Sequence, residues 1–200
     1  MIEVEIKFSL LHGNEQRAIE GAELIGTKIN SDVYYDNKEF TLTLKDWWLR
    51  KRNANFELKL PPNRDLRNID NQARRYEELT EEPDIINALG FSGADITTLL
   101  TDNNYKSFAD LVTTRTSYKH GQYRIDIDHT NFNYSIGELE LLVEDVKEVK
   151  AAEKKLIQFL AERDISYSKN DFGKVAYYLQ KNSSEHFDKL VEAGVINSEA

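Results

Sequence analysis

The first strand-like segment of the chain alternates strictly between apolar and charged residues. In residues 2–8 every even position is apolar, and positions 3, 5 and 7 carry Glu, Glu and Lys. Side chains in an extended strand point alternately to opposite faces, so this period of two predicts a strand with one apolar and one ionic face. Such a strand needs an apolar layer on one side and water or a charged ligand on the other.

The same alternation recurs along the chain and predicts a largely antiparallel β protein with added helices. Helical spacing of apolar residues predicts helices over residues 14–24, two short helices between 83 and 100, and a helical C-terminal part from about residue 150, with helices at 150–163, 172–181 and 184–192. Prolines at positions 61 and 62 and the polar stretch to residue 72 predict an exposed loop. Strands are predicted at residues 2–8, 32–36, 40–45, 48–52, 56–60, 74–79, 108–119, 122–128 and 134–144.

Length and composition restrict the class of protein. Two hundred residues without a linker predict one domain, residues 1–200. The chain has no cysteine, four histidines without a close pair and a net charge of −9, which disfavours a zinc site and a nucleic-acid partner. No apolar run is long enough for a membrane span, so we expect a cytoplasmic protein without an evident obligate protein partner.

The ionic faces of the strands hold both signs of charge at every second position. One explanation is a sheet with one ordinary solvated side. However, at least five strands place two or more ionisable groups in line, and such groups would be costly inside a closed sheet unless a charged ligand compensates them. The residues concerned are Glu3, Glu5 and Lys7; Arg50 and Arg52; Glu57 and Lys59; Arg115 and Lys119; Arg124, Asp126 and Asp128; and Glu138 and Glu140.

These residue types match a particular ligand chemistry. Carboxylates from separate strands are the oxygen donors that Mg²⁺ or Mn²⁺ prefers. Arginine binds phosphate as a bidentate fork and lysine as a point charge. A cavity that combines both sets suits metal-assisted phosphoryl transfer to water. The sequence contains no glycine-rich phosphate loop and no nucleophile-elbow motif that would indicate a different chemistry.

An ordered set of motifs resembles the CYTH, or triphosphate tunnel metalloenzyme, superfamily, and within it the thiamine triphosphatases. The resemblance extends from residue 1 to about residue 181, with a shorter first loop and a distinct stretch after Asn182. It rests on Glu-x-Glu-x-Lys at residues 3–7, Tyr-Tyr-Asp at 34–36, Trp-Leu-Arg-Lys-Arg at 48–52, Glu-Leu-Lys at 57–59, Tyr-Glu-Glu-Leu-Thr at 76–80, Arg-Ile-Asp-Ile-Asp at 124–128, Gly-Glu-Leu-Glu at 137–140 and Lys174 followed by Tyr-Leu at 178–179.

The resemblance implies an α+β fold in which an eight-stranded antiparallel closed β-barrel forms a tunnel flanked by helices. It also implies roles for individual residues. Metal positions are Glu3, Glu5, Asp126, Glu140 and, less directly, Asp128; catalytic residues are Glu3, Glu5, Lys7 and Glu138. Substrate-binding positions are Lys7, Trp48, Arg50, Arg52, Lys59, Arg115, Arg124, Glu138 and Lys174.

The implied activity is metal-dependent hydrolysis of the terminal phosphate of thiamine triphosphate. Trp48 is expected to stack on the thiamine rings, although it could equally pack under a neighbouring helix. Lys174 falls on a predicted helix, so its role rests on the resemblance, and a solvated helix lysine is the alternative. The alternatives are an inorganic tripolyphosphatase, a nucleoside triphosphatase or adenylate cyclase of the same superfamily, and a non-catalytic polyphosphate-binding module.

Overall fold

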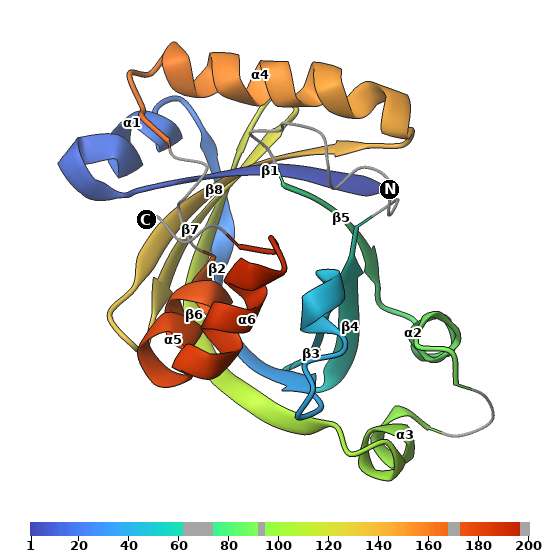
Figure 1. Ribbon diagram of the computed structural model, residues 1–200. Helices are drawn as coiled ribbons and strands as arrows, with labels where there is room; N and C mark the ends of the chain where they lie inside the picture. Colours follow the sequence, from blue (N-terminus) through green and yellow to red (C-terminus); the bar gives the residue numbers. More distant parts are fainter. Residues whose placement is uncertain (62–73, 92–94, 168–172, 197–200) are drawn as a thin grey trace.

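Eight antiparallel strands form a closed barrel (Figure 1). The computed structural model describes residues 1–61, 74–91, 95–167 and 173–196. Around the barrel the order is β1-β5-β4-β3-β2-β6-β7-β8, which confirms the expected eight-stranded closed fold. The strands are β1 (Ile2–Phe8), β2 (Glu23–Asp36), β3 (Trp48–Arg52), β4 (Asn55–Leu60), β5 (Arg74–Leu79), β6 (Lys106–His120), β7 (Tyr123–Thr130) and β8 (Ser135–Val143).

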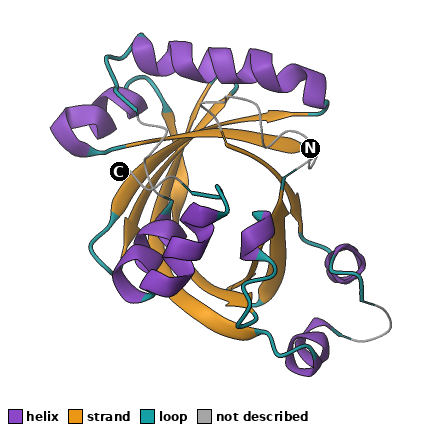
Figure 2. Ribbon diagram, in the orientation of Figure 1, coloured by secondary structure: helices purple, strands orange, loops and turns teal. Residues whose placement is uncertain are grey.

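Helices flank the barrel on several sides (Figure 2). None of those in the described ranges is long and apolar enough to cross a membrane. The α-helices are α1 (Asn14–Ile19), α2 (Glu82–Ala88), α3 (Ile96–Asp102), α4 (Val149–Ala161), α5 (Lys174–Asn182) and α6 (Ser184–Glu192), and short 3₁₀ turns are η1 (Leu11–Gly13), η2 (Thr43–Lys45) and η4 (Val146–Glu148).

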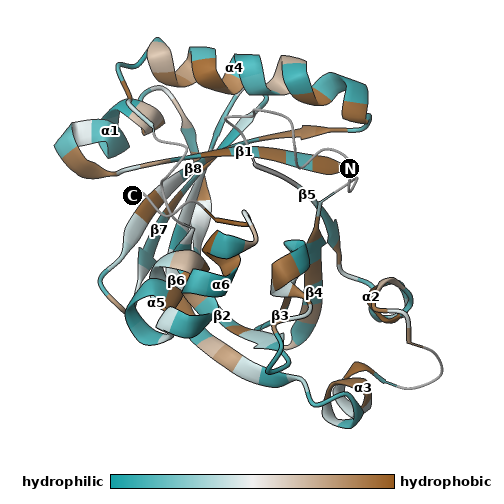
Figure 3. Ribbon diagram, in the orientation of Figure 1, coloured by the Kyte–Doolittle hydropathy of each residue, from teal (hydrophilic) through white to brown (hydrophobic). Residues whose placement is uncertain are grey.

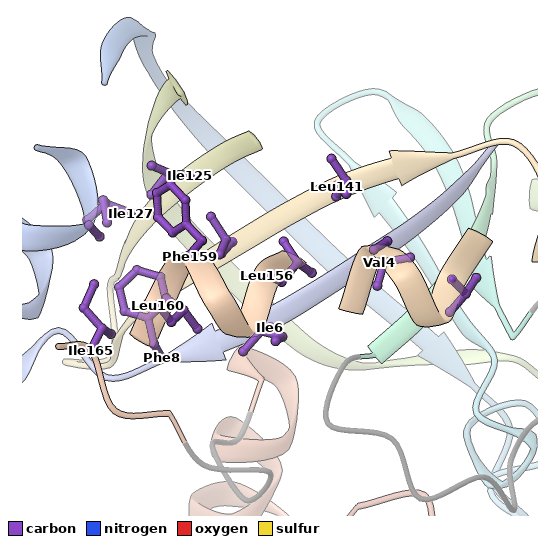
Figure 4. Close-up of a cluster of buried hydrophobic side chains, with 14 of the residues drawn as sticks. Val4, Ile6, Phe8, Ile125, Ile127, Leu141, Leu156, Phe159, Leu160 and Ile165 are labelled. Carbon is purple, nitrogen blue, oxygen red and sulfur yellow. The ribbon is translucent and has the colours of Figure 1, made fainter. Parts of the chain in front are cut away.

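The apolar face of β1 forms the main core together with α4. The even-numbered residues of β1 are buried against the apolar stripe of the helix, which includes Leu156, Phe159 and Leu160 (Figure 4). In Figure 3 brown and teal alternate along α4, as expected for a helix with one buried face. Each such Leu or Phe side chain contributes about 1.5–3 kcal/mol by leaving water. This burial directs the charged face of β1 into the barrel.

One close contact in this core requires glycine. Phe8 of β1 lies opposite Gly137 of β8 in the register. A Cβ atom at position 137 would lie 2.2 Å from Cζ of Phe8, so any other residue would clash with the ring. Gly137 therefore leaves room for the ring of Phe8 against β8.

The other helices cover different parts of the barrel. Helices α2 and α3, which correspond to the two short helices predicted between residues 83 and 100, pack against Leu49 and Leu58 on β3 and β4. Helices α5 and α6 pack against Tyr34, Trp48 and Leu111 of the barrel strands. In Figure 1 these two helices lie in front of the barrel opening.

Two predicted elements differ from the structure. The helix expected over residues 14–24 ends at Ile19, because Gly21 adopts a positive φ of 71° and β2 begins at Glu23. From Glu23 onward β2 pairs with β6 along its length. Cross-strand pairing over fourteen residues thus overrides the local helical spacing.

The strand expected at residues 40–45 is a turn that contains η2. The Asp36 carboxylate accepts hydrogen bonds from the backbone N–H groups of Leu42 and Thr43 at 3.1 and 2.8 Å, and Phe40 adopts a positive φ of 56°. These bonds replace the ladder bonds of a strand. The loop predicted up to residue 72 lies, beyond Pro61, outside the described residues.

Candidate active site

The inward faces of the strands enclose a cavity of about 400 Å³. Both signs of charge line it, and aromatic and apolar residues contribute one part of its wall. The lining residues are Glu3, Glu5, Lys7, Tyr34, Trp48, Arg50, Arg52, Lys59, Tyr76, Glu78, Arg115, Arg124, Glu138, Glu140, Leu142, Gly173, Lys174, Val175, Ala176 and Ile196. Every residue predicted for the site is in this list except Asp126 and Asp128, which are completely buried and bonded to Arg115 of the lining.

Most carboxylates of the cavity come from three neighbouring strands, β1, β7 and β8. The register places Glu5 directly opposite Glu140, and Asp126 opposite Glu138. We call this region the carboxylate wall; it comprises Glu3, Glu5, Asp126, Asp128, Glu138 and Glu140.

Two overlapping groups within the carboxylate wall could hold a metal ion. In each group the carboxylate oxygens lie within 4.8 Å of one another, and Glu140 belongs to both. The groups are Glu3, Glu5 and Glu140, and Asp126, Glu138 and Glu140. Oxygen donors in this number are the ligands that Mg²⁺ and Mn²⁺ prefer.

Glu140 shows the electrostatic consequence of this crowding. Burial first, and then the charges of Glu3, Glu138 and Asp126, raise the pKa of Glu140 well above its usual value of 4.5. Burial also raises the pKa of Glu3, with a contribution from Glu5, although Lys59 opposes the shift. The charged form of this group is therefore unfavourable until a cation is added, which fits a divalent metal.

Lys7 and Glu138 form the centre of an ion-pair network across the cavity. Lys7 Nζ donates to Glu5 at 2.6 Å and to Glu138 at 3.2 Å, and Lys174 Nζ donates to Glu138 at 2.9 Å. Burial opposes the ionisation of Glu5, but chiefly Lys7 lowers its pKa to about 2. Burial likewise opposes ionisation of Glu138, yet Lys174, Lys7 and Arg115 hold its pKa well below 4.5.

Arg115 of β6 connects this centre to β7. Its guanidinium donates to both oxygens of Asp128 at 2.7 Å and to Asp126 at 2.6 Å, and it also bonds to Glu138. Arg124 reaches Asp126 at 3.0 Å and Glu140 at 3.8 Å, with 46% of its side chain exposed. Arg115 is thus held within the network, whereas Arg124 lies where the cavity meets solvent.

The opposite part of the cavity is rich in cations. We call it the cationic wall: Arg50 and Arg52 of β3 and Lys59 of β4. Arg52 makes a bidentate bond to Asp32 of β2 at 2.7 and 2.8 Å, and Lys59 Nζ reaches Glu3 at 2.7 Å. Each cation therefore takes a carboxylate partner from another strand.

Arg50 has the most partners in the cationic wall. It donates to Glu57 at 2.7 Å, to Glu78 at 2.8 Å and to the Tyr34 hydroxyl at 3.4 Å. Burial works against the charge of Arg50, but these partners and Asp32 keep its pKa well above the usual value. The guanidinium stays charged, and it is available to an anion that replaces a carboxylate partner.

Lys174 and Trp48 are the two site residues for which the sequence also allowed a structural interpretation. Lys174 is the first residue of α5 and is buried, with bonds to Asp128 and Glu138, so it is not a solvated helix lysine. Trp48 lines the cavity and also packs with Leu179 and Phe187 of α5 and α6. Its position therefore combines a cavity wall with helix packing.

The sequence analysis did not single out several members of the site. Asp32, Glu78, Tyr34 and Tyr76 either line the cavity or bond to a residue that does. The alternation of Asp32 and Tyr34 on one face of β2 was a usable signal. Glu78 faces Lys59 in the register between β4 and β5, which the sequence does not reveal.

A closed barrel with a carboxylate wall, a cationic wall and a buried ion-pair network offers oxygen ligands for a metal ion and cations for a polyanion in one cavity. The CYTH domain family model matches residues 1–171. The chain belongs to the CYTH family.

Individual relatives agree with this assignment. The human thiamine-triphosphatase is 30% identical over 210 residues, which covers 96% of this chain and 90% of that protein. The PH1819 protein of Pyrococcus horikoshii OT3 has the same fold, with a TM-score of 0.63 at 20% identity over 90% of this chain and 99% of its own. A Hippeastrum protein, a proposed adenylyl cyclase with a dominant triphosphatase activity, has a TM-score of 0.57 at 18% identity, covering 92% and 98% of the chains.

Proposed function

We propose that this protein hydrolyses the terminal phosphoanhydride bond of thiamine triphosphate with Mg²⁺ or Mn²⁺, giving thiamine diphosphate and phosphate. The observation that carries the proposal is the single cavity in which the carboxylate wall faces the cationic wall. Similarity to the human thiamine-triphosphatase over nearly the whole chain supports the choice of substrate. We treat residues 1–200 as one functional domain.

The carboxylate wall supplies the metal ligands in this proposal. Glu3, Glu5 and Glu140 form one set, and Asp126 with Glu140 belongs to a second. When bound there, the divalent cation polarises phosphoryl oxygens and helps to position the attacking water. Glu138 and Asp128 already accept from two or more cations, so we assign them to holding Lys7, Arg115 and Lys174 in place.

The cations bind the triphosphate. In the structure these cations bind carboxylates, as in the pairs of Lys59 with Glu3 and of Lys7 with Glu5. Once those carboxylates serve as metal ligands, the two ammonium groups can exchange them for phosphate oxygens. Arg50, Arg52, Arg115, Arg124 and Lys174 add fixed positive charge, which stabilises the charge that develops on the transferred phosphoryl group.

The organic end of the substrate fits the aromatic part of the cavity. Tyr34, Trp48 and Tyr76 line it beside Ala176 and Ile196. A thiazolium ring carries a positive charge, and an aromatic face attracts it by a cation–π interaction. The three rings lie next to the cationic wall, so one molecule can contact both regions.

Inorganic tripolyphosphate is the second candidate substrate. The packing of Trp48 between the barrel and helices α5 and α6 favours it, because a ring committed to packing does not need an organic ligand. Both substrates would use the same carboxylates and cations. A cyclase reaction has no such supporting feature among the described residues.

The decisive measurement is kcat/KM for thiamine triphosphate and for tripolyphosphate, each with Mg²⁺, with Mn²⁺ and with EDTA. We expect turnover of thiamine triphosphate that requires the metal and releases one phosphate. A folded Glu5→Gln variant should lose most of this activity, because it removes a ligand and the partner of Lys7. Turnover in EDTA, or binding without turnover, would refute the proposal.

A further inference from the structure

One carboxylate outside the lining of the cavity connects two of its aromatic rings. Oδ1 of Asp46 accepts a hydrogen bond from Nε1 of Trp48 at 2.8 Å and another from the Tyr76 hydroxyl at 3.0 Å. Trp48 belongs to β3 and Tyr76 to β5, and β4 lies between these strands. A single oxygen therefore fixes rings from two strands that do not pair with each other.

The backbone holds Asp46 firmly in this position. It follows η2 in the left-handed region, with φ 63° and ψ 33°, and its N–H donates to the carbonyl of Thr43 at 2.9 Å. Thr43 is in turn bonded to the buried Asp36 carboxylate through its N–H at 2.8 Å and its hydroxyl at 2.7 Å. The turn that replaced the predicted strand at residues 40–45 thus presents a preorganised carboxylate to the two rings.

The two rings are nearly buried, yet both line the cavity, while Asp46 does not. Asp46 is therefore connected to a ligand in the cavity through Trp48 and Tyr76. An oxygen that accepts from both the indole N–H and the phenol O–H holds the two rings in a fixed orientation and adds electron density to them. Both effects favour a flat organic cation against the ring faces. Neither effect reaches a purely inorganic polyphosphate, which is bound by the cationic wall.

We propose that Asp46 is a positioning residue that makes the tunnel selective for a triphosphate bearing a cationic aromatic group over inorganic tripolyphosphate. The inference rests on the proposed function, since it concerns the organic end of the same substrate site. In this proposal, substrate selectivity depends on the turn at residues 43–46 as well as on the residues that line the cavity.

Two substitutions at position 46 separate this role from a general structural one. Asp46→Asn keeps an oxygen that can accept both hydrogen bonds and tolerates the left-handed backbone. Asp46→Gly also suits a φ of 63° but removes the acceptor. Asn133→Gly, at an exposed position with φ 58° outside the lining of the cavity, is the matched control for adding glycine at such a backbone position.

Steady-state kinetics with Mg²⁺ give the first readout. Asp46→Gly should raise KM for thiamine triphosphate about tenfold. KM and kcat for tripolyphosphate should stay within about twofold of wild type. Asp46→Asn should recover most of the loss, and Asn133→Gly should match wild type. Equal changes for both substrates in Asp46→Gly, or no change for thiamine triphosphate, would overturn the inference.

Binding without turnover gives the second readout. In a Trp47→Phe background, quenching of Trp48 fluorescence by thiamine triphosphate in the presence of Ca²⁺ reports occupancy of the aromatic end. The inference requires about tenfold weaker binding in Asp46→Gly and near-normal binding in Asp46→Asn. If this pattern appears but no variant hydrolyses the substrate with Mg²⁺ or Mn²⁺, the proposed function fails and the role of Asp46 stands. If hydrolysis is normal and the binding is unchanged, the role of Asp46 fails and the function stands.

Discussion

The carboxylate wall and the cationic wall face each other across one cavity but balance their charges differently. The three cations of the cationic wall find partners on β2, β4, β5 and β1, as in the bidentate pair of Arg52 with Asp32. In the carboxylate wall, Glu140 lies 3.8 Å from Arg124 and 4.0 Å from Arg115, and its pKa is raised. Every cation of the cationic wall therefore has a close carboxylate partner, whereas Glu140 of the carboxylate wall has only more distant cations.

Because of this difference, the charges of the two walls should contribute differently to fold stability and to metal binding. An ion pair between close partners stabilises the fold, and an anionic ligand must displace the carboxylate in order to bind the cation. A charge that is crowded and unsatisfied destabilises the fold but is ready for a cation. Substitutions on the two walls should consequently have different effects on the free energy of unfolding and on metal affinity.

The largest effect is expected for Glu140→Gln. It belongs to both carboxylate groups, so kcat/KM with Mg²⁺ should fall about 10³-fold. A carboxylate whose pKa is raised in the folded state destabilises that state when ionised, so the variant should unfold at the same or a higher Tm in EDTA. Parallel kinetic and thermal-unfolding measurements test this. A loss of activity accompanied by a lower Tm in EDTA would indicate a structural role instead.

The next largest effect is a pH dependence of stability that arises in helix α6, which packs against the barrel. His186 of α6 stacks on Phe40 with ring centroids 4.0 Å apart, and its Nε2 lies 2.8 Å from the Thr43 hydroxyl. Burial lowers the pKa of His186 to about 4 from 6.5. The unfolded chain therefore takes up a proton first as pH falls through 6.5, and stability present above that pH is lost toward pH 4.

By about pH 5 this loss should be on the order of 2 kcal/mol in the free energy of unfolding. Denaturant unfolding from about pH 7 to about pH 5 measures it. His186→Gln cannot titrate and should have a shallower pH dependence across this range. The same slope in both proteins would show that other groups cause the acid destabilisation.

A moderate effect is expected for Arg52→Lys on the cationic wall. Lysine keeps the charge but cannot form the bidentate bond to Asp32, nor a fork on a phosphate. KM should rise about tenfold for both thiamine triphosphate and tripolyphosphate. The increase in Tm caused by Mg²⁺ should stay the same, because no metal ligand has changed. A reduced metal-dependent increase would place Arg52 in the metal site.

The smallest effect is proton release on metal binding. Because the pKa of Glu140 is raised, binding of Mg²⁺ must displace part of a proton from it. Metal affinity should therefore fall as pH is lowered through this raised pKa. Calorimetry in two buffers with different ionisation enthalpies counts the released protons. The Glu140→Gln variant should release fewer protons when Mg²⁺ binds. An unchanged number of released protons would show that they come from another group.

Several parts of the fold and site were predictable from local patterns. Alternation in residues 2–8 correctly separated the buried face of β1 from the face that lines the cavity. It succeeded because the period of two is a property of any extended strand. The turn at residues 40–45 shows the limit of the same rule. Its backbone N–H groups donate to the carboxylate of Asp36, which lies outside the segment, so the alternation within the segment could not predict the turn.

Lys174 and Asp32 show a second limit. The position of Lys174 on a predicted helix suggested solvent, but α5 begins beside the barrel and places Nζ within reach of Glu138. The sequence analysis assigned no role to Asp32, although this residue binds Arg52 from a neighbouring strand. Neither contact follows from spacing along the chain, because each joins residues from different elements.

The sequence by itself determined which residues share a face and which chemistry those faces can support, since strand geometry and side-chain type are local properties. Only the tertiary structure decided which faces meet. Barrel closure set Glu5 opposite Glu140 and brought Lys59 to Glu3, and it left Glu140 short of positive charge. These relations depend on register and closure, because electrostatic interactions act through space between strands that are far apart in the chain.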